Sequence, residues 1–325
     1  MALTGGKRLH YIQYQSVEYE SGRKGKAAFS TRVGIHVSIA RGIEKAIFRA
    51  GELGCTTMQI FSRNPRGWKA KSLSEKAVST FREVREKNDI DPIIIHTPYL
   101  LNLASADETL HRRSTLALAL DIRRAEQLGA GFVVTHLGST GGKRRASGLK
   151  RVVRALKEVI DQESPVVVLL ENSAGAGNSV GTVLEELQEI IDRVGKSDRL
   201  GVCFDSCHGY AAGYDFRSPK KTEALAKKID QTIGKRCLAL LHLNDCSGDL
   251  GAHRDRHQHI GRGKIGLAGF QNLLSHPSFQ EIPIILETPK DSPDDDSKNL
   301  ARIRRILKTP SPVRESLDGS GSLGK

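Results

Sequence analysis

Paired cysteines and long apolar runs are missing from this sequence, and each absence excludes a class of protein. The five cysteines are odd in number and form no C-x-x-C pair, so the sequence indicates neither a disulfide framework nor a zinc ribbon. No run approaches the roughly 18 apolar residues that a membrane-spanning helix needs, so we expect no membrane partner. We interpret the cysteines as small buried hydrophobes in a reducing compartment; they are Cys55, Cys203, Cys207, Cys237 and Cys246.

The ends of the chain lack the pattern of a folded domain. Residues 1–30 are basic and polar, carry Glu18 and Glu20, and have no apolar core of a secretion signal, so we interpret them as an extension. Residues 309–325 are rich in Ser, Gly and Pro, a composition typical of a disordered tail or linker. The sequence therefore predicts one domain over residues 31–308.

Acidic residues are fewer than basic ones. Fifty Lys and Arg face 37 Asp and Glu, which gives a formal net charge of +13 and favours a polyanionic partner such as nucleic acid. Charge alone does not decide the matter, because ribosome-associated proteins and proteins of salty habitats have similar compositions.

Eight short, β-branched apolar runs alternate with longer amphipathic stretches, which is the pattern of repeated βα units around a parallel sheet. A closed (β/α)8 barrel takes about 250 residues, so we predict an α/β protein with a single TIM barrel. The predicted strands are Val33–Val37, Thr57–Phe61, Pro92–His96, Phe132–His136, Val166–Glu171, Leu200–Asp205, Leu238–Leu243 and Ile282–Glu287. Helical patterns cover Gly42–Leu53, Thr109–Leu128, Leu149–Ile160, Val180–Val194 and Leu267–Leu274.

Metal-binding residue types stand at the ends of six of these eight runs. Active sites of TIM barrels lie at the carboxyl ends of the strands, so side chains at these positions are candidates for function. Any one of them could be a hydrogen-bonded core residue, and the inference depends on the set. The six residues are His96, His136, Glu171, Asp205, His242 and Glu287.

Three further candidates, His208, Asp255 and His257, lie on predicted loops beyond the strands, which makes nine groups. One zinc ion takes about four ligands, so nine groups imply two or three ions. Imidazole and carboxylate ligation without thiolates suits Zn²⁺, with Mn²⁺ or Fe²⁺ as alternatives. A cluster of several metal ions suits phosphodiester hydrolysis, and the basic chain makes DNA the expected substrate.

Several long motifs resemble those of the endonuclease IV family of apurinic/apyrimidinic endonucleases, in the same order, from about Val33 to Lys308. They are Gly34-Ile35-His36-Val37-Ser38, His96-Thr97-Pro98-Tyr99, Glu171-Asn172-Ser173-Ala174-Gly175, Cys203-Phe204-Asp205-Ser206-Cys207-His208, His242-Leu243-Asn244-Asp245, Asp255-Arg256-His257 and Leu286-Glu287-Thr288-Pro289. The family belongs to the xylose-isomerase-like barrels.

The resemblance implies three zinc ions and cleavage of double-stranded DNA 5′ to an abasic site. A metal-bound hydroxide would attack the phosphorus in line, leaving a 3′-hydroxyl and a 5′-deoxyribose phosphate, and blocked 3′ ends would be trimmed. Glu171 would be catalytic as the ligand shared by two ions. The implied ligand sets are His96, His136 and Glu171; Glu171, Asp205, His242 and Glu287; and His208, Asp255 and His257.

Arg66 and Tyr99 match the family's positions that enter the duplex and flip out the abasic nucleotide. Arg66 as an ordinary surface cation stays an alternative. We interpret Trp68 as a packing anchor of its loop. His36 ends a strand but matches no family ligand, so we expect it beside a ligand or in contact with substrate.

Some positions depart from the family or stay open. Leu137 and Arg262 stand where many members have Pro and Glu; neither is a ligand position, and Arg262 adds a cation near the cluster. We interpret Asp291–Asp296 as a solvated turn rather than a calcium site. The basic stretch Lys143-Arg144-Arg145 and Arg151 could contact phosphates or be plain surface.

Two other functions compete with the nuclease. A sugar isomerase of the related barrels would need one or two metals and no DNA-contacting residues, and a silent DNA-damage binding protein would have lost a ligand. We expect an intracellular monomer that works in the cytoplasm or, in a eukaryote, in the nucleus.

Overall fold

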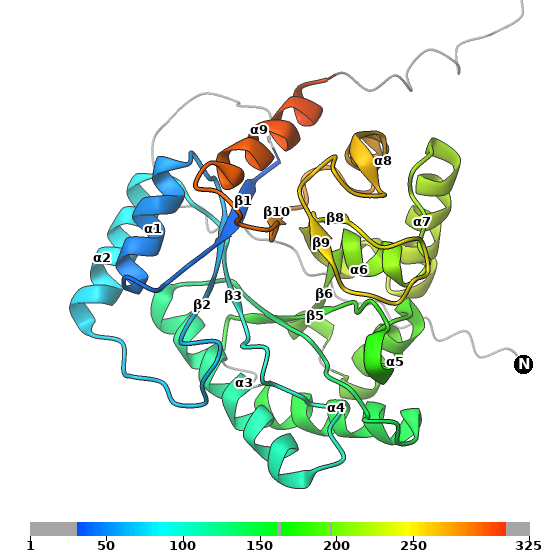
Figure 1. Ribbon diagram of the computed structural model, residues 1–325. Helices are drawn as coiled ribbons and strands as arrows, with labels where there is room; N and C mark the ends of the chain where they lie inside the picture. The colour runs from blue at the N-terminus through cyan, green and yellow to red at the C-terminus, as the bar shows by residue number, and fades with distance from the viewer. Residues whose placement is uncertain (1–30, 161–163, 196, 310–325) are drawn as a thin grey trace, which may run out of the picture.

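Eight parallel strands close into a barrel in the computed structural model, which describes residues 31–160, 164–195 and 197–309 (Figure 1). The order around the barrel is β1-β10-β7-β6-β5-β4-β3-β2. The strands are β1 (Val33–Val37), β2 (Met58–Phe61), β3 (Ile93–His96), β4 (Phe132–Thr135), β5 (Val167–Glu171), β6 (Leu200–Asp205), β7 (Leu238–His242) and β10 (Ile284–Leu286). The predicted single-domain TIM barrel is confirmed. The predicted extension 1–30 lies outside the described residues, as does the predicted tail except for Thr309.

Helices surround the strands (Figure 1). Eight of those in the described part of the chain form the outer layer: α1 (Ile43–Glu52), α2 (Glu75–Lys87), α3 (Glu108–Leu128), α4 (Arg145–Val159), α5 (Leu184–Val194), α7 (Pro219–Thr232), α8 (Gly266–Ser275) and α9 (Asp295–Lys308). Three 3₁₀ turns, η1 (Ala176–Asn178), η2 (Ser197–Arg199) and η3 (Lys235–Cys237), lie between them. Among the described residues, none of the helices combines the length and the apolar character that a membrane span requires.

Two small elements were not predicted. A six-residue helix, α6 (Ser206–Ala211), directly follows β6, and a two-stranded antiparallel sheet pairs β8 (Asp245–Cys246) with β9 (His257–Gln258). Both lie beyond the carboxyl ends of barrel strands, and α6 packs beside β8 (Figure 1).

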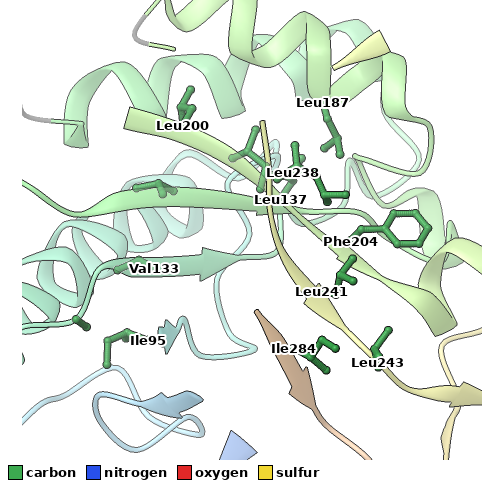
Figure 2. Close-up of a cluster of buried hydrophobic side chains, with 14 of the residues drawn as sticks. Ile95, Val133, Leu137, Leu187, Leu200, Phe204, Leu238, Leu241, Leu243 and Ile284 are labelled. Atoms are coloured by element: carbon green, nitrogen blue, oxygen red, sulfur yellow. The ribbon is translucent and has the colours of Figure 1, made fainter. Parts of the chain in front are cut away.

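The strands separate two buried apolar layers, because successive side chains of a strand point to opposite faces. One set, part of which Figure 2 shows, packs between the barrel and the outer helices; it includes Ile95, Val133, Leu241 and Ile284. The alternate residues form a separate small cluster that fills the barrel interior. Its buried members are Ile94, Phe132, Val134, Leu169, Cys203, Leu240 and Ile285.

Candidate metal centre

On six of the eight strands, the inward face carries one more residue beyond the interior apolar layer, and these six residues are predicted ligands. His96 follows Ile94 by two positions and Glu171 follows Leu169 by two, so both point inward at the carboxyl end of the barrel. Since parallel strands all end on one side, the same two-residue step brings the remaining strand-end candidates together. His136 and Glu287 lie one residue beyond β4 and β10, where the prediction placed them inside the strands.

The first group of candidate ligands lies at the ends of β3, β4 and β5. His96 Nε2 lies 3.1 Å from Glu171 Oε2, and His136 Nδ1 lies 3.6 Å from the same oxygen. Ligand atoms of the three residues all lie within 4.8 Å of one another. His96 and Glu171 are buried, whereas the His136 side chain is 32% exposed, so this group is open to solvent on one side.

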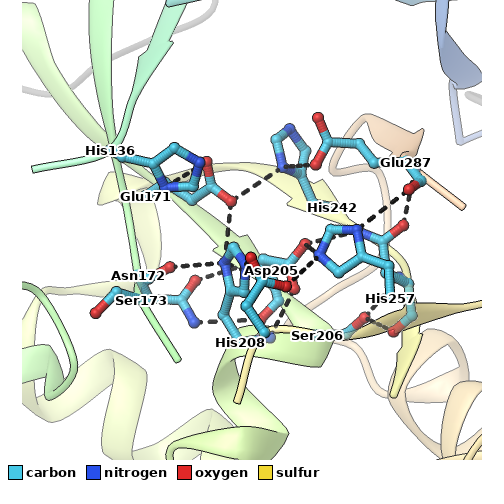
Figure 3. Close-up of polar contacts among 12 residues, drawn as sticks. His136, Glu171, Asn172, Ser173, Asp205, Ser206, His208, His242, His257 and Glu287 are labelled. Carbon is cyan, nitrogen blue, oxygen red and sulfur yellow. Dashed lines mark hydrogen bonds and ion pairs between the residues drawn. The ribbon is translucent and has the colours of Figure 1, made fainter. Parts of the chain in front are cut away.

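The second group contains Glu171, Asp205, His242 and Glu287, again with ligand atoms within 4.8 Å of one another. His242 Nδ1 lies 3.4 Å from Glu171 Oε1 and 3.2 Å from Glu287 Oε2. Glu171 therefore belongs to two groups and presents a different oxygen to each (Figure 3).

The third group joins His208, Asp255 and His257. The two Asp255 oxygens lie 3.1 Å from His208 Nε2 and 3.3 Å from His257 Nε2. Placing His208 and His257 on loops was wrong, because His208 lies in α6 and His257 in β9. The Asp205 side chain caps α6 by accepting a hydrogen bond from the His208 backbone N–H at 2.7 Å, which ties the helix to the second group.

Four of the five imidazoles in these groups donate a hydrogen bond from one ring nitrogen. The acceptor is a backbone or side-chain amide oxygen that is not itself a candidate ligand atom. An amide or peptide carbonyl oxygen only accepts, so that ring nitrogen keeps its proton, and the other ring nitrogen is the one that a cation can bind in place of a proton. The bonds are His96 Nδ1 to the Thr97 carbonyl (2.7 Å), His208 Nδ1 to the Asn172 carbonyl (3.0 Å), His257 Nδ1 to the Glu287 carbonyl (3.1 Å) and His242 Nε2 to Gln59 Oε1 (2.9 Å).

Three buried amides support the candidate ligands, and sequence reasoning missed their role. Asn172 brackets the Asp205 backbone, accepting from its N–H at 2.7 Å and donating to its carbonyl at 3.2 Å. Asn244 donates to Asp205 Oδ2 at 2.6 Å and accepts from the Glu287 N–H at 2.8 Å. Gln59 contacts His242 and Glu287. A possible signal was their placement, since two stand within two residues of a candidate ligand and Gln59 interrupts an apolar strand.

The carboxylates and imidazoles of the candidate metal centre shift one another's pKa values toward the charged forms. Burial raises the pKa of Glu171, but His136 and His242 outweigh it and bring that pKa well below the ordinary value. Burial lowers the pKa of His208 and of His242, but their neighbours, Asp205 for His208 and Cys203 and Glu287 for His242, raise both pKa values well above 6.5. The centre is therefore a dense set of ion pairs in which the imidazole protons occupy positions that divalent cations could take.

Unpartnered atoms show that the centre suits such cations. Glu171 Oε1, His242 Nδ1 and His257 Nε2 are buried and have no hydrogen bond. Leaving a buried polar atom unpaired costs about 1–3 kcal/mol. One cation in the second group would satisfy Glu171 Oε1 and His242 Nδ1, and another in the third group would satisfy His257 Nε2. Cys207 also lies near Asp205 and His257, but contact with the Cys246 thiol and burial raise its pKa, so it stays a thiol. The donor set is nitrogen and oxygen, which fits zinc.

Tyr99 and Arg66, which are predicted to contact DNA, lie at the exposed edge of the candidate metal centre. Tyr99 is 69% exposed, and its ring packs edge-on at 5.3 Å against Phe61 at the end of β2. Arg66 is exposed and lines a pocket of about 630 Å³ together with His36. Trp68 packs against the core with the Arg113 guanidinium 4.4 Å from its ring centre, which confirms its interpretation as a packing anchor.

A buried ionic cluster fixes the loop that carries Arg66. Arg63 donates to both carboxylate oxygens of Asp121 on α3, at 3.1 and 3.0 Å, and to the Gly67 carbonyl at 3.0 Å. Arg124, one turn further along α3, donates to the Lys71 carbonyl at 2.9 Å. Both ends of the loop are thus attached to the same helix.

The acidic stretch Asp291–Asp296 is only in part the solvated turn that the sequence predicts. Asp295 and Asp296 are buried in the first turn of α9, so the solvated-turn prediction is wrong for them. His259 donates from Nε2 to Asp291 at 3.2 Å and accepts from Asn299 at 3.0 Å, so the additional cluster of His259, Asp291 and Asp295 satisfies its own imidazole. Of the basic residues left open, Arg145 pairs with Glu186 and Arg151 donates to a backbone carbonyl, so both have partners inside the fold.

Comparisons with known proteins agree with this architecture. A family model described as a xylose isomerase-like TIM barrel matches residues 47–309. Proteins named probable endonuclease 4 from Methanoculleus marisnigri and Methanosphaerula palustris are 46% and 42% identical to this chain. These alignments cover 84% and 85% of this chain and 98% of each relative.

Two solved structures share the fold of this chain but differ widely in sequence identity to it. Endonuclease IV from Thermus thermophilus matches with a TM-score of 0.76 and 37% identity, covering 85% of this chain and 98% of that one. A D-psicose 3-epimerase solved in the presence of D-fructose matches with a TM-score of 0.62 over 85% and 97% of the two chains, but at 15% identity. The likeness to the sugar epimerase therefore concerns the fold alone.

Proposed function

This chain belongs to the endonuclease IV family of xylose isomerase-like TIM barrels, and we propose that it is a metal-dependent DNA-repair endonuclease that hydrolyses the phosphodiester 5′ to an abasic site. The observation that carries the proposal is the convergence of three ligand groups around Glu171, whose two oxygens face different groups. The products would be a 3′-hydroxyl and a 5′-deoxyribose phosphate, and blocked 3′ ends would be trimmed by the same hydrolysis.

Three zinc ions, one for each group, are part of the proposal. Bound there, zinc would supply an activated water and neutralise negative charge on the phosphate and the leaving oxygen. Glu171 would keep the first two groups at a set separation, because one carboxylate serves both. Asn172 and Asn244 would hold Asp205 in place between the second and third groups.

The surrounding residues would bind the DNA. Arg66 and Tyr99 lie on loops after β2 and β3, where exposed side chains can enter a duplex and displace the abasic nucleotide toward the ligand groups. The net charge of +13 favours association with the phosphate backbone. All nine ligand residues come from one chain, so the proposal needs no second copy.

Incision of a defined duplex tests the proposal. Purified full-length protein is incubated with a duplex that contains one abasic analogue, after chelator treatment and after zinc restoration, and the same duplex with an intact nucleotide is the control. We expect zinc-dependent incision 5′ to the lesion and none of the control. Failure to incise with zinc, manganese or iron would contradict the proposal.

Metal analysis separates the nuclease from a sugar isomerase. About three ions per chain are expected, one for each group, whereas the isomerases typically use one or two. One ion per chain together with turnover of a ketose would favour the isomerase.

A further inference from the structure

Gln59 is a buried amide in the middle of the apolar strand β2, which reads Met-Gln-Ile-Phe. Its side chain has no exposed surface. Burying an amide costs about 1–3 kcal/mol unless it is hydrogen-bonded, so an amide at this position needs partners inside the barrel. It lies beside the second ligand group, between His242 and Glu287.

The orientation of this amide follows from its partners. Gln59 Nε2 donates to Glu287 Oε1 at 2.6 Å, and Gln59 Oε1 lies 2.9 Å from His242 Nε2. Exchanging the oxygen and the nitrogen would place two acceptors, the amide oxygen and the carboxylate, against each other. The second amide hydrogen points to His36 Nδ1, 2.9 Å from Gln59 Nε2, so His36 also has a place in this network.

His242 depends on this amide for its tautomer. Because Nε2 donates its proton to Gln59, Nδ1 is the nitrogen that can exchange its proton for a cation, and it faces Glu171 and Glu287 at 3.4 and 3.2 Å. The corresponding bonds of His96, His208 and His257 go to backbone carbonyls, which are present whatever the residue type. In His242 the acceptor is a side chain, so a substitution can remove it.

Glu287 receives the other half of the same contact. Its Oε1 takes the hydrogen bond from Gln59, while Oε2 lies 3.2 Å from His242 Nδ1. Gln59 thus fixes Glu287 Oε1 by a hydrogen bond, and Glu287 Oε2 points toward the other members of the second group. A single amide therefore orients two of the four members of the second group.

We propose that Gln59 is a positioning residue of the second ligand group, which sets the tautomer of His242 and the orientation of the Glu287 carboxylate, so that the affinity of this group for a divalent cation depends on the amide. The inference rests on the proposed function of the three groups. Residues that support metal ligands in this way commonly contribute 10- to 100-fold in metal affinity, and we expect a loss of about that size on substitution.

Gln59→Met tests the inference, because methionine has a similar length and no hydrogen bond to offer. Zinc affinity of the full-length protein is measured by competition with a chelating indicator, and the His242 tautomer by long-range ¹H–¹⁵N correlation, with its signals assigned by their absence in a His242→Gln protein. We expect one of three zinc ions to bind about 10- to 100-fold more weakly and, in the zinc-loaded protein, the Nε2–H form of His242 to lose its dominance. Met58→Leu, a change in the neighbouring buried residue of the same strand, should alter neither readout.

Gln59→Glu keeps the inference testable if the methionine protein does not fold. The new carboxylate still accepts from His242 Nε2–H but cannot donate to Glu287, so the tautomer should persist while zinc binding weakens. Wild-type zinc affinity in either folded variant would overturn the inference alone. Absence of zinc binding in the wild-type protein would overturn the proposed function together with it.

Discussion

Two buried polar clusters of this barrel differ in whether they are complete. In the loop anchor, formed by Arg63, Asp121 and Arg124, the guanidinium groups donate to a carboxylate or to backbone carbonyls within the fold. In the ligand cluster, formed by the three groups around Glu171, three buried atoms have no hydrogen bond. A complete polar cluster holds a segment in place, whereas an incomplete one retains the capacity to bind.

Electrostatics points to the same difference. Burial raises the pKa of Asp121, and Arg63 offsets that effect in part by hydrogen bonding to both of its oxygens. Such a pair adds little net stability, but removing one partner leaves an uncompensated buried charge. In the ligand cluster the compensation comes from imidazole protons, which a metal ion can displace.

Glu171→Gln should have the largest effect, because it removes the ligand shared by two groups. We expect incision to fall on the order of 1,000-fold, since metal ions contribute several kcal/mol to such reactions. Duplex affinity should survive, and fewer zinc ions should remain bound. Gel incision assays, titration of labelled duplex and metal analysis measure these outcomes, with exposed Glu83→Gln as the control. Loss of duplex binding with zinc content intact would contradict the shared role.

Asp121→Asn should break the loop anchor and spare the ligand cluster. Two guanidinium groups would lose their buried counter-charge, so the free energy of unfolding should drop by about 3 kcal/mol. Denaturant titration measures the drop, and metal analysis should still find the wild-type zinc content. A parallel loss of zinc would show that the two clusters are not independent.

The chelator-treated protein should lose stability as pH rises above neutrality. The pKa values of His208 and His242 are raised in the fold, so their contribution is complete below about 6.5, the value in an unfolded chain, and is lost as pH rises through the folded values. The pKa of Glu171 is lowered, so its contribution is lost as pH falls below about 4.3.

Thermal unfolding from pH 6 to 9, with and without zinc, measures this. The stabilisation by zinc should grow with pH, because fewer protons then compete for the imidazoles. A zinc effect that shrinks with rising pH would contradict the interpretation of the ligand cluster. Asp121→Asn should not change the trend.

Arg113→Leu should have the smallest effect. It removes the guanidinium stacked at 4.4 Å on Trp68, which is worth about 0.5–1 kcal/mol at an exposed site. Denaturant titration measures the decrease, and Arg112→Leu, an exposed neighbour on α3, is the control. An equal effect of both substitutions would mean that the stacking contributes nothing specific.

The sequence by itself determined the barrel and the nine candidate ligands. Side chains alternate between the two faces of a strand, and all strands of a TIM barrel run in the same direction. These two rules place His96, Glu171 and His242 at one end of the barrel from the sequence alone. Helix boundaries shifted by a few residues, since caps and turns decide where a helix ends.

Only the tertiary structure decided how the ligand groups are supported. Gln59 and Glu287 are 228 residues apart in the chain, and Arg63 and Asp121 are 58 apart. Such pairs leave no periodicity in the sequence, because a side-chain hydrogen bond depends on which strands become neighbours when the barrel closes. For the same reason the sequence predicts loops where the structure has α6, which carries His208, and the β8–β9 pair, which carries His257.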